Sequence, residues 1–231
     1  MRWLKYQALA AAIALCMAAA VARAGEDRSD DPEMLKTLLA LKWTPTWFHP
    51  DKFGMTVGTR RYVHGDYRGA LHYFEIGAYY ADKFSQLSLG LMHMNGEGTN
   101  KDLVTGYAWL DLAAERGYPE FVVTRDRFRS ELSPAQLEQA VVVRNKLATR
   151  YADAVAKPRL IVQLHQGQMN LTGSHTGFRW DLGEWDPDRY FSMRDREWSG
   201  VVTVGPVKEQ EAPDTDAQPL DPPASEEAQK H

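Results

Sequence analysis

The stretch that decides the fold is residues 66–117, DYRGALHYFEIGAYYADKFSQLSLGLMHMNGEGTNKDLVTGYAWLDLAAERG. Its beginning and its end match each other at a fixed interval of 36 residues. The matching pairs are Asp66 with Asp102, Ala70 with Gly106, Tyr73 with Trp109, Gly77 with Ala113, and Ala81 with Gly117. Repeats of this length are typical of stacked helix pairs, because one pair cannot bury its apolar face alone. We therefore expect an all-α fold, a short α/α helix-pair solenoid.

Within this stretch, residues 84–117 predict two helices joined by a tight turn. Leu87 and Leu91 fall on one stripe of the first helix. Gly96 and Gly98 follow it, and glycine accepts the positive φ that ends a helix. Asp102 is placed to cap the free amide groups at the start of the second helix.

The combination of these residues resembles the Sel1-like repeat, a relative of the tetratricopeptide class with two antiparallel helices in each unit. The residues that carry the resemblance are Leu89, Gly90, Gly96, Gly98, Asp102, Trp109, Ala113, Ala114 and Gly117. One unit covers residues 82–117, and the second half of a preceding unit covers residues 66–81. The sequence departs from the family pattern at His93, where tyrosine is usual, and at Tyr73, where tryptophan is usual.

The resemblance implies a binding protein whose first helix in each unit lines a concave surface. The candidates for contact with a protein or peptide partner on that helix are Ser85, Gln86, Ser88, Met92 and His93. The alternative is an ordinary solvated helix face, with His93 partly buried in the position of the tyrosine.

A capping helix is expected to close the repeat domain, which we place at residues 66–157. Ser133, Pro134 and Gln136 form a strong start signal, with a serine cap, a proline in the first turn and a glutamine that completes a capping box. We expect this helix to run to about Ala156, before Pro158.

The N-terminal flank, residues 25–65, predicts a short amphipathic helix at 32–43 and an irregular segment at 44–65. The residues that interrupt helical periodicity in that segment are Pro45, Pro50, Gly54 and Gly58. The C-terminal flank, residues 158–205, predicts an irregular segment with short strands at 159–164 and 201–204. Residues 206–231 are rich in proline and acidic residues and have no aromatics, which favours a disordered acidic tail.

Aromatic and acidic residues alternate in the C-terminal flank. Trp180, Trp185 and Tyr190 carry this pattern, and three interpretations remain open for them. Trp180 and Trp185, together with Phe191, anchor the segment onto the helices, or the aromatic residues form part of a protein interface, or Trp180, Trp185 and Tyr190 bind a glycan of the cell envelope.

The N-terminus predicts export. Residues 1–24 combine a short basic region, an apolar core and an Ala-x-Ala site, so we expect a signal peptide that is cleaved after Ala24. The apolar run is shorter than a bilayer span, and we expect a periplasmic protein without stable membrane insertion. Cys16 is the only cysteine, so cleavage leaves no thiol for catalysis, metal binding or a disulfide.

Composition excludes some function classes. The net charge is −4, whereas a nucleic-acid binder usually carries a basic excess. No catalytic or nucleotide-binding motif occurs, and we expect neither enzymatic activity nor a cofactor. A metal-dependent hydrolase is the remaining alternative, with the candidate residues His165, His175, Asp181 and Glu184. The favoured hypothesis is an exported scaffold that binds a protein or peptide partner in the cell envelope.

Overall fold

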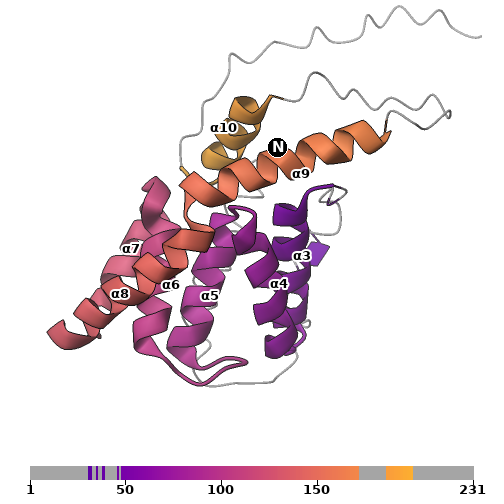
Figure 1. The fold of residues 1–231 in the computed structure, drawn as a ribbon. Helices are drawn as coiled ribbons and strands as arrows, with labels where there is room; N and C mark the ends of the chain where they lie inside the picture. Colours follow the sequence, from indigo (N-terminus) through magenta and orange to yellow (C-terminus); the bar gives the residue numbers. More distant parts are fainter. Residues whose placement is uncertain are drawn as a thin grey trace, which may run out of the picture. The chain divides into compact units, whose positions relative to one another are not determined.

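A computed structural model describes residues 48–171 and 186–199, with the side chains of 168–171 excepted, and a few positions between 31 and 46 (Figure 1). All of them belong to the first of two units, residues 1–201; the second unit, residues 202–231, lies outside the described residues. The described part is all-helical and contains no strand. None of its helices combines the length and the apolarity needed to cross a bilayer.

Helices in contact make up the described part of the chain. They are α3 (Pro50–Val63), α4 (Tyr67–Tyr79), α5 (Lys83–Asn95), α6 (Leu103–Ala113), the short 3-10 helix η2 (Ala114–Arg116), α7 (Pro119–Arg129), α8 (Pro134–Tyr151), α9 (Asp153–Leu171) and α10 (Pro187–Trp198). Helix α3 packs on α4, α4 on α5, α5 on α6, and both α7 and α8 on α6. Helix α9 crosses the upper ends of α4 and α5 in Figure 1, and α10 lies beside its beginning.

Local capping signals explain where the central helices begin and end. Asp66, Asp82 and Asp102 precede α4, α5 and α6, and each carboxylate accepts a hydrogen bond from an amide of the first helical turn. Helix α5 ends at Gly96, which has a φ of 77°. The expected order of helix, glycine turn and helix between residues 83 and 113 is confirmed.

Helix α3 corrects the prediction of an irregular segment at 44–65. Gly54 and Gly58 lie inside this helix and do not break it. A Cβ on Gly54 would lie 2.2 Å from the backbone nitrogen of Gly77, and one on Gly58 would lie 2.6 Å from the Phe74 ring. These glycines therefore allow α3 and α4 to approach closely. Most of the helix expected at 32–43 lies outside the described residues.

The C-terminal flank also differs from the prediction. The capping box at Ser133 is present, but α8 ends at Tyr151, and α9 then runs through Pro158. Residues 159–164 belong to this helix and do not form a strand, because Leu160 and Leu164 lie one turn apart and are both buried. Proline is tolerated near the beginning of α9, where it costs one backbone hydrogen bond. The signal peptide at 1–24, the strand at 201–204 and the tail at 206–231 lie outside the described residues.

The core is continuous from α3 to α8. Trp109 is buried, and its ring meets the Tyr151 ring at a centroid distance of 4.7 Å. A Cβ on Gly90 would lie 2.7 Å from Leu110 Cδ2, so α5 and α6 also approach closely. The buried repeat residues thus serve packing between neighbouring helices. The other members of the repeat pattern that are buried are Leu89, Ala113 and Ala114.

Candidate functional site

Charged side chains gather at the beginning of α5, where α3, η2, α9 and α10 meet it. We call them the charged cluster: Asp51, Asp82, Lys83, Glu115, Arg116, Asp153, Arg194, Asp195 and Glu197. The side chains of Lys83 and Asp82 are 1% and 0% exposed. Charged groups are seldom buried so completely unless they are paired. The cluster is therefore the chemically distinctive part of the described structure.

Helix α10 contributes a buried arginine to the cluster. The Arg194 guanidinium donates hydrogen bonds to Asp82 Oδ1 and Glu197 Oε2, and its Nε lies 3.9 Å from Asp51 Oδ2. The Tyr190 hydroxyl donates to Asp51 Oδ2. Burial alone would lower the pKa of Arg194, but the carboxylates of Glu197 and Asp82 raise it. Arg194 is therefore held in its charged form.

The partner of this arginine, Asp82, has a second role. Its Oδ2 accepts hydrogen bonds from the backbone nitrogen and the hydroxyl of Ser85, at 2.7 and 2.6 Å. Burial raises the pKa of Asp82, although Arg194 and Ser85 oppose the shift. The same carboxylate thus caps α5 and binds α10.

Lys83 forms the other buried centre of the cluster. Its Nζ lies 2.7 Å from Glu115 Oε2 and 3.1 Å from Asp153 Oδ1. It also donates to Gln86 Oε1 at 3.0 Å and to the Leu112 carbonyl at 3.1 Å. Burial lowers the pKa of Lys83, and the two carboxylates oppose this shift. Four acceptors therefore surround an ammonium group on a side chain that is almost completely buried.

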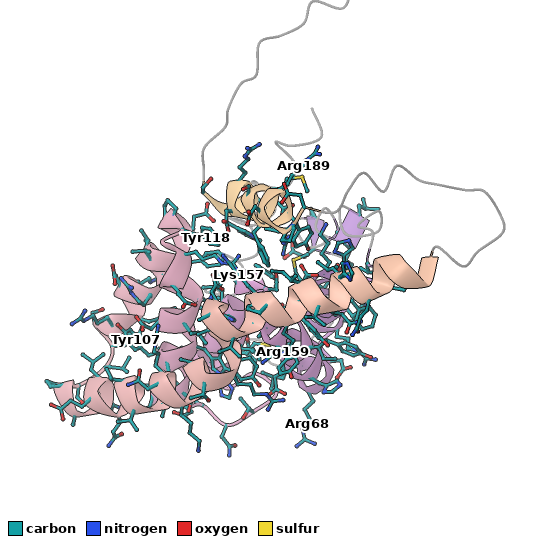
Figure 2. All side chains as sticks on the ribbon, turned by 45° about the horizontal axis from the view of Figure 1, so that its top comes forward. Arg68, Tyr107, Tyr118, Lys157, Arg159 and Arg189 are labelled. Atoms are coloured by element: carbon teal, nitrogen blue, oxygen red, sulfur yellow. The ribbon has the colours of Figure 1, made fainter. Side chains whose placement is uncertain are left out.

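Arg116 links the Lys83 centre to helix α10. It binds Asp153 through two hydrogen bonds, Nε to Oδ2 at 2.6 Å and Nη2 to Oδ1 at 2.9 Å, which is the strong bidentate geometry. Its Nη1 lies 3.3 Å from Asp195 Oδ1, and the Tyr118 hydroxyl donates to the same oxygen. Burial would raise the pKa of Asp153, but Arg116 and Lys83 lower it. Tyr118 and Lys157, both labelled in Figure 2, also contact α10. The Tyr118 hydroxyl binds Asp195, and the Lys157 ammonium lies 4.9 Å from the centroid of the Phe191 ring.

The residues expected to line a concave surface lie inside the fold. The side chains of Ser85, Gln86, Ser88 and Met92 are fully buried. Gln86 donates to the Tyr151 carbonyl at 2.8 Å, and Ser88 donates to the Phe84 carbonyl at 2.9 Å. Ser85, Gln86 and Ser88 are polar members of the core, and each donates its hydrogen bond within the chain. None of the four side chains is therefore available to a binding partner.

The remaining candidates have different environments. His93 is half-buried, and burial lowers its pKa while Asp102 opposes the shift. Tyr190 is buried, which leaves its ring covered by the chain itself. Trp180 and Trp185 lie outside the described residues.

The metal-site alternative gains no support. His165 lies on α9 and is exposed, whereas His175, Asp181 and Glu184 lie outside the described residues. Among the residues with described side chains, no three metal-binding groups converge.

The charged cluster was not found from the sequence. Lys83, Arg116 and Arg194 lie in ordinary helical surroundings, where charged side chains usually face water. Apart from Glu197, which follows Arg194 by three residues, their carboxylate partners lie at least 32 residues away along the chain, so no local pattern signals the pairing.

The cluster is suited to holding helices in a defined geometry. Buried ion pairs add little net stability because the charges lose their hydration, so we expect this cluster to act by fixing how the helices pack. Among the described side chains, the buried polar atoms without a hydrogen-bond partner include His49 Nδ1 and Asp51 Oδ1, which lie 3.9 Å apart. The His49 ring stacks on Tyr190 at 5.3 Å.

We expect His49 to make the fold sensitive to mild acid. Burial and the charge of Lys52 lower its pKa to about 4, with Asp51 opposing the shift and Arg194 adding to it. The unfolded histidine has a pKa of about 6.5, so the unfolded state binds a proton first as the pH falls between these values. The free energy of unfolding should fall by up to about 3 kcal/mol across this range.

Urea unfolding at pH 7, 5.5 and 4.5 measures this loss. Carboxylates of the cluster also titrate in acid, so the informative quantity is the difference between wild type and His49→Gln. The variant should lose distinctly less stability than wild type between pH 7 and 4.5. Equal losses would contradict the assignment to His49.

Comparisons of the chain with protein-family models, curated protein sequences and solved structures found no match. We therefore infer function from the helical architecture and from the contacts of the chain itself.

Proposed function

We propose that this protein is an exported, non-catalytic scaffold for protein–protein interactions, built from helix pairs of the Sel1-like type. The observation that carries the proposal is that positions 36 residues apart have equivalent roles. Asp66 and Asp102 cap α4 and α6, and Gly54 and Gly90 lie where one helix closely approaches the next. Equivalent roles at a constant interval are expected of a helix-pair array.

The close helix contacts support a binding role. Gly54 allows α3 to contact the backbone of α4, and Gly90 allows α5 to contact α6. A surface held in one shape loses little conformational entropy on binding, so more of the contact energy appears as affinity. Helix-pair arrays commonly use such preformed surfaces.

Exposed apolar side chains identify the part of the surface to test. Val141 and Val142 on α8 are 57% and 70% exposed, and Val123 on α7 is 67% exposed. Isolated surface valines are common. Neighbouring exposed valines on the last helix that packs on α6 supply contact area for a protein partner.

The test is affinity capture from cell-envelope extract with the full chain and with Val141→Asp/Val142→Asp. We expect wild type to retain a defined protein that the variant retains at least tenfold less. Glu138→Lys, an exposed change on the same helix, serves as the matched control. Retention of cell-wall glycan alone, or equal retention by both chains, would overturn the proposal.

A further inference from the structure

We propose that α10 occupies, within its own chain, a binding site for an amphipathic helix, and that release of α10 exposes this site to a partner helix. The partner would present tyrosine, arginine and tryptophan at intervals of four residues. The inference names the partner class and the regulation of the proposed scaffold, and in that respect it rests on the proposed function.

The residues by which α10 binds the rest of the chain lie on one face. Tyr190, Arg194 and Trp198 are spaced by four residues and therefore share a side of the helix. Trp198 stacks on Phe84 at a centroid distance of 5.4 Å with an interplanar angle of 11°. Tyrosine, arginine and tryptophan are the residues that dominate binding energy at protein interfaces.

The surface beneath α10 has the complementary chemistry. Asp51 and Asp82 lie under Arg194, and the Phe84 and Phe121 rings lie against Trp198. Without a cation over them, these carboxylates would stand close together, which is unfavourable for two like charges. The site therefore selects a helix that carries an arginine one turn before a large aromatic residue.

The contacts of α10 resemble a reversible interface more than a core. Of its twelve residues, only Tyr190, Phe191 and Arg194 are buried. Most of the others are charged or polar, and Arg189 lies on the side turned away from Tyr118 and Lys157 (Figure 2). A helix of this length is not stable alone in water, so α10 depends on its docking site.

The helices from α3 to α8 do not need α10 to bury their apolar faces, whereas Leu160 and Leu164 of α9 form a second apolar cluster with Tyr190 and Phe191 of α10. The main apolar core is formed by residues of α3 to α8 with Ala152, and Trp198 is the only side chain of α10 that packs against it. Release of α10 would therefore leave the helix pairs from α3 to α8 assembled, and it would expose the acidic and aromatic site together with Leu160 and Leu164.

The experiment measures binding of a labelled peptide, DPDRYFSMRDREWS (residues 186–199), to the full chain by fluorescence anisotropy. In wild type, α10 competes with the peptide for the site. The apparent affinity is therefore the intrinsic affinity multiplied by the fraction of molecules from which α10 is released. In Arg194→Ala/Trp198→Ala the intramolecular competitor is weakened and the site is unchanged. We expect this variant to bind the peptide at least tenfold more tightly than wild type.

Two matched controls isolate the site. Arg189→Ala changes an exposed residue of α10 and should bind the peptide like wild type. A peptide that carries the Arg194→Ala and Trp198→Ala changes should not bind either chain. A double variant that retains its helical circular dichroism but does not bind the wild-type peptide would overturn the inference.

Hydrogen exchange of the wild-type chain provides a test without substitutions. The amides of α10 should exchange through a local opening, at least tenfold faster than those of α5 and α6. Exchange of all three helices at one common rate would overturn the inference. So would a wild-type dimer that the double variant converts to monomer, because α10 would then be exchanged between two copies.

The two proposals can fail separately. If the peptide binds as expected and the envelope extract yields no protein partner, the helix-binding site stands and the scaffold function fails. If a protein is captured through the α8 valines and the peptide does not bind, the scaffold stands and the α10 inference fails.

Discussion

Replacing Lys83 with methionine will lower the free energy of unfolding by about 3 to 5 kcal/mol, because removal of one partner leaves buried charges uncompensated. The ammonium group lies within 3.1 Å of both Glu115 and Asp153. Methionine fills a similar volume but offers no charge and no hydrogen-bond donor. Glu115 would then lose its cationic partner, whereas Asp153 would keep Arg116 and Lys157.

Lys157→Met is the matched control for this change. Lys157 also pairs with Asp153, at 3.2 Å, but its side chain is 29% exposed. A pair that water can reach contributes about 1 kcal/mol or less. Urea unfolding of both variants at pH 7 separates the two cases, and equal losses of stability would contradict the role of Lys83.

The second large effect is expected for Gly54→Ala, which should cost about 3 kcal/mol or more. The added Cβ would lie 2.2 Å from the nitrogen and 2.6 Å from the Cα of Gly77. Both are backbone atoms, so no side-chain rotation relieves the overlap, and α3 must move away from α4.

Gly117→Ala separates this overlap from the general cost of replacing glycine. Gly117 has a φ of 69°, and a Cβ there would meet no atom within 4 Å. Alanine at this position should lower the free energy of unfolding by about 1 kcal/mol, which is the cost of the left-handed backbone conformation alone. Chemical denaturation followed by circular dichroism compares the two. The close approach of α3 and α4 would be refuted if Gly54→Ala cost no more than Gly117→Ala.

The parts of the fold that could be predicted are those with local signals. Asp102 caps a helix by bonding an amide three residues away, and Gly96 ends one by its own backbone conformation. The side chain of Ser133 accepts a hydrogen bond from the backbone amide of Gln136, and the side chain of Gln136 accepts one from the backbone amide of Ser133. Such interactions depend on neighbours in the sequence, so a pattern of a few residues is enough to find them.

The parts that could not be predicted depend on distant partners. In the sequence, Gly54 has the same appearance as a glycine that interrupts a helix. Its actual role, to let α3 approach the backbone of α4, depends on a helix that is distant in the sequence. From the sequence, Gln86 is expected on the surface because glutamine is polar. In the structure it is buried, because its side chain donates a hydrogen bond to the Tyr151 carbonyl, 65 residues away. The candidate site was missed for the same reason, because Asp82 and Arg194 are 112 residues apart.

The long sequence distances within the charged cluster have a consequence for the order of folding. The helix pairs from α3 to α6 connect near neighbours, and these contacts can form while the chain is being synthesised. Lys83 and Arg116 must wait for Asp153, and Arg116 must wait longer for Asp195. In a nascent chain that ends before residue 153, Lys83 can pair with Glu115, but the carboxylate partners of Arg116 have not yet been made. Completion of the electrostatic network therefore marks the moment at which the chain has been made through its last described helix.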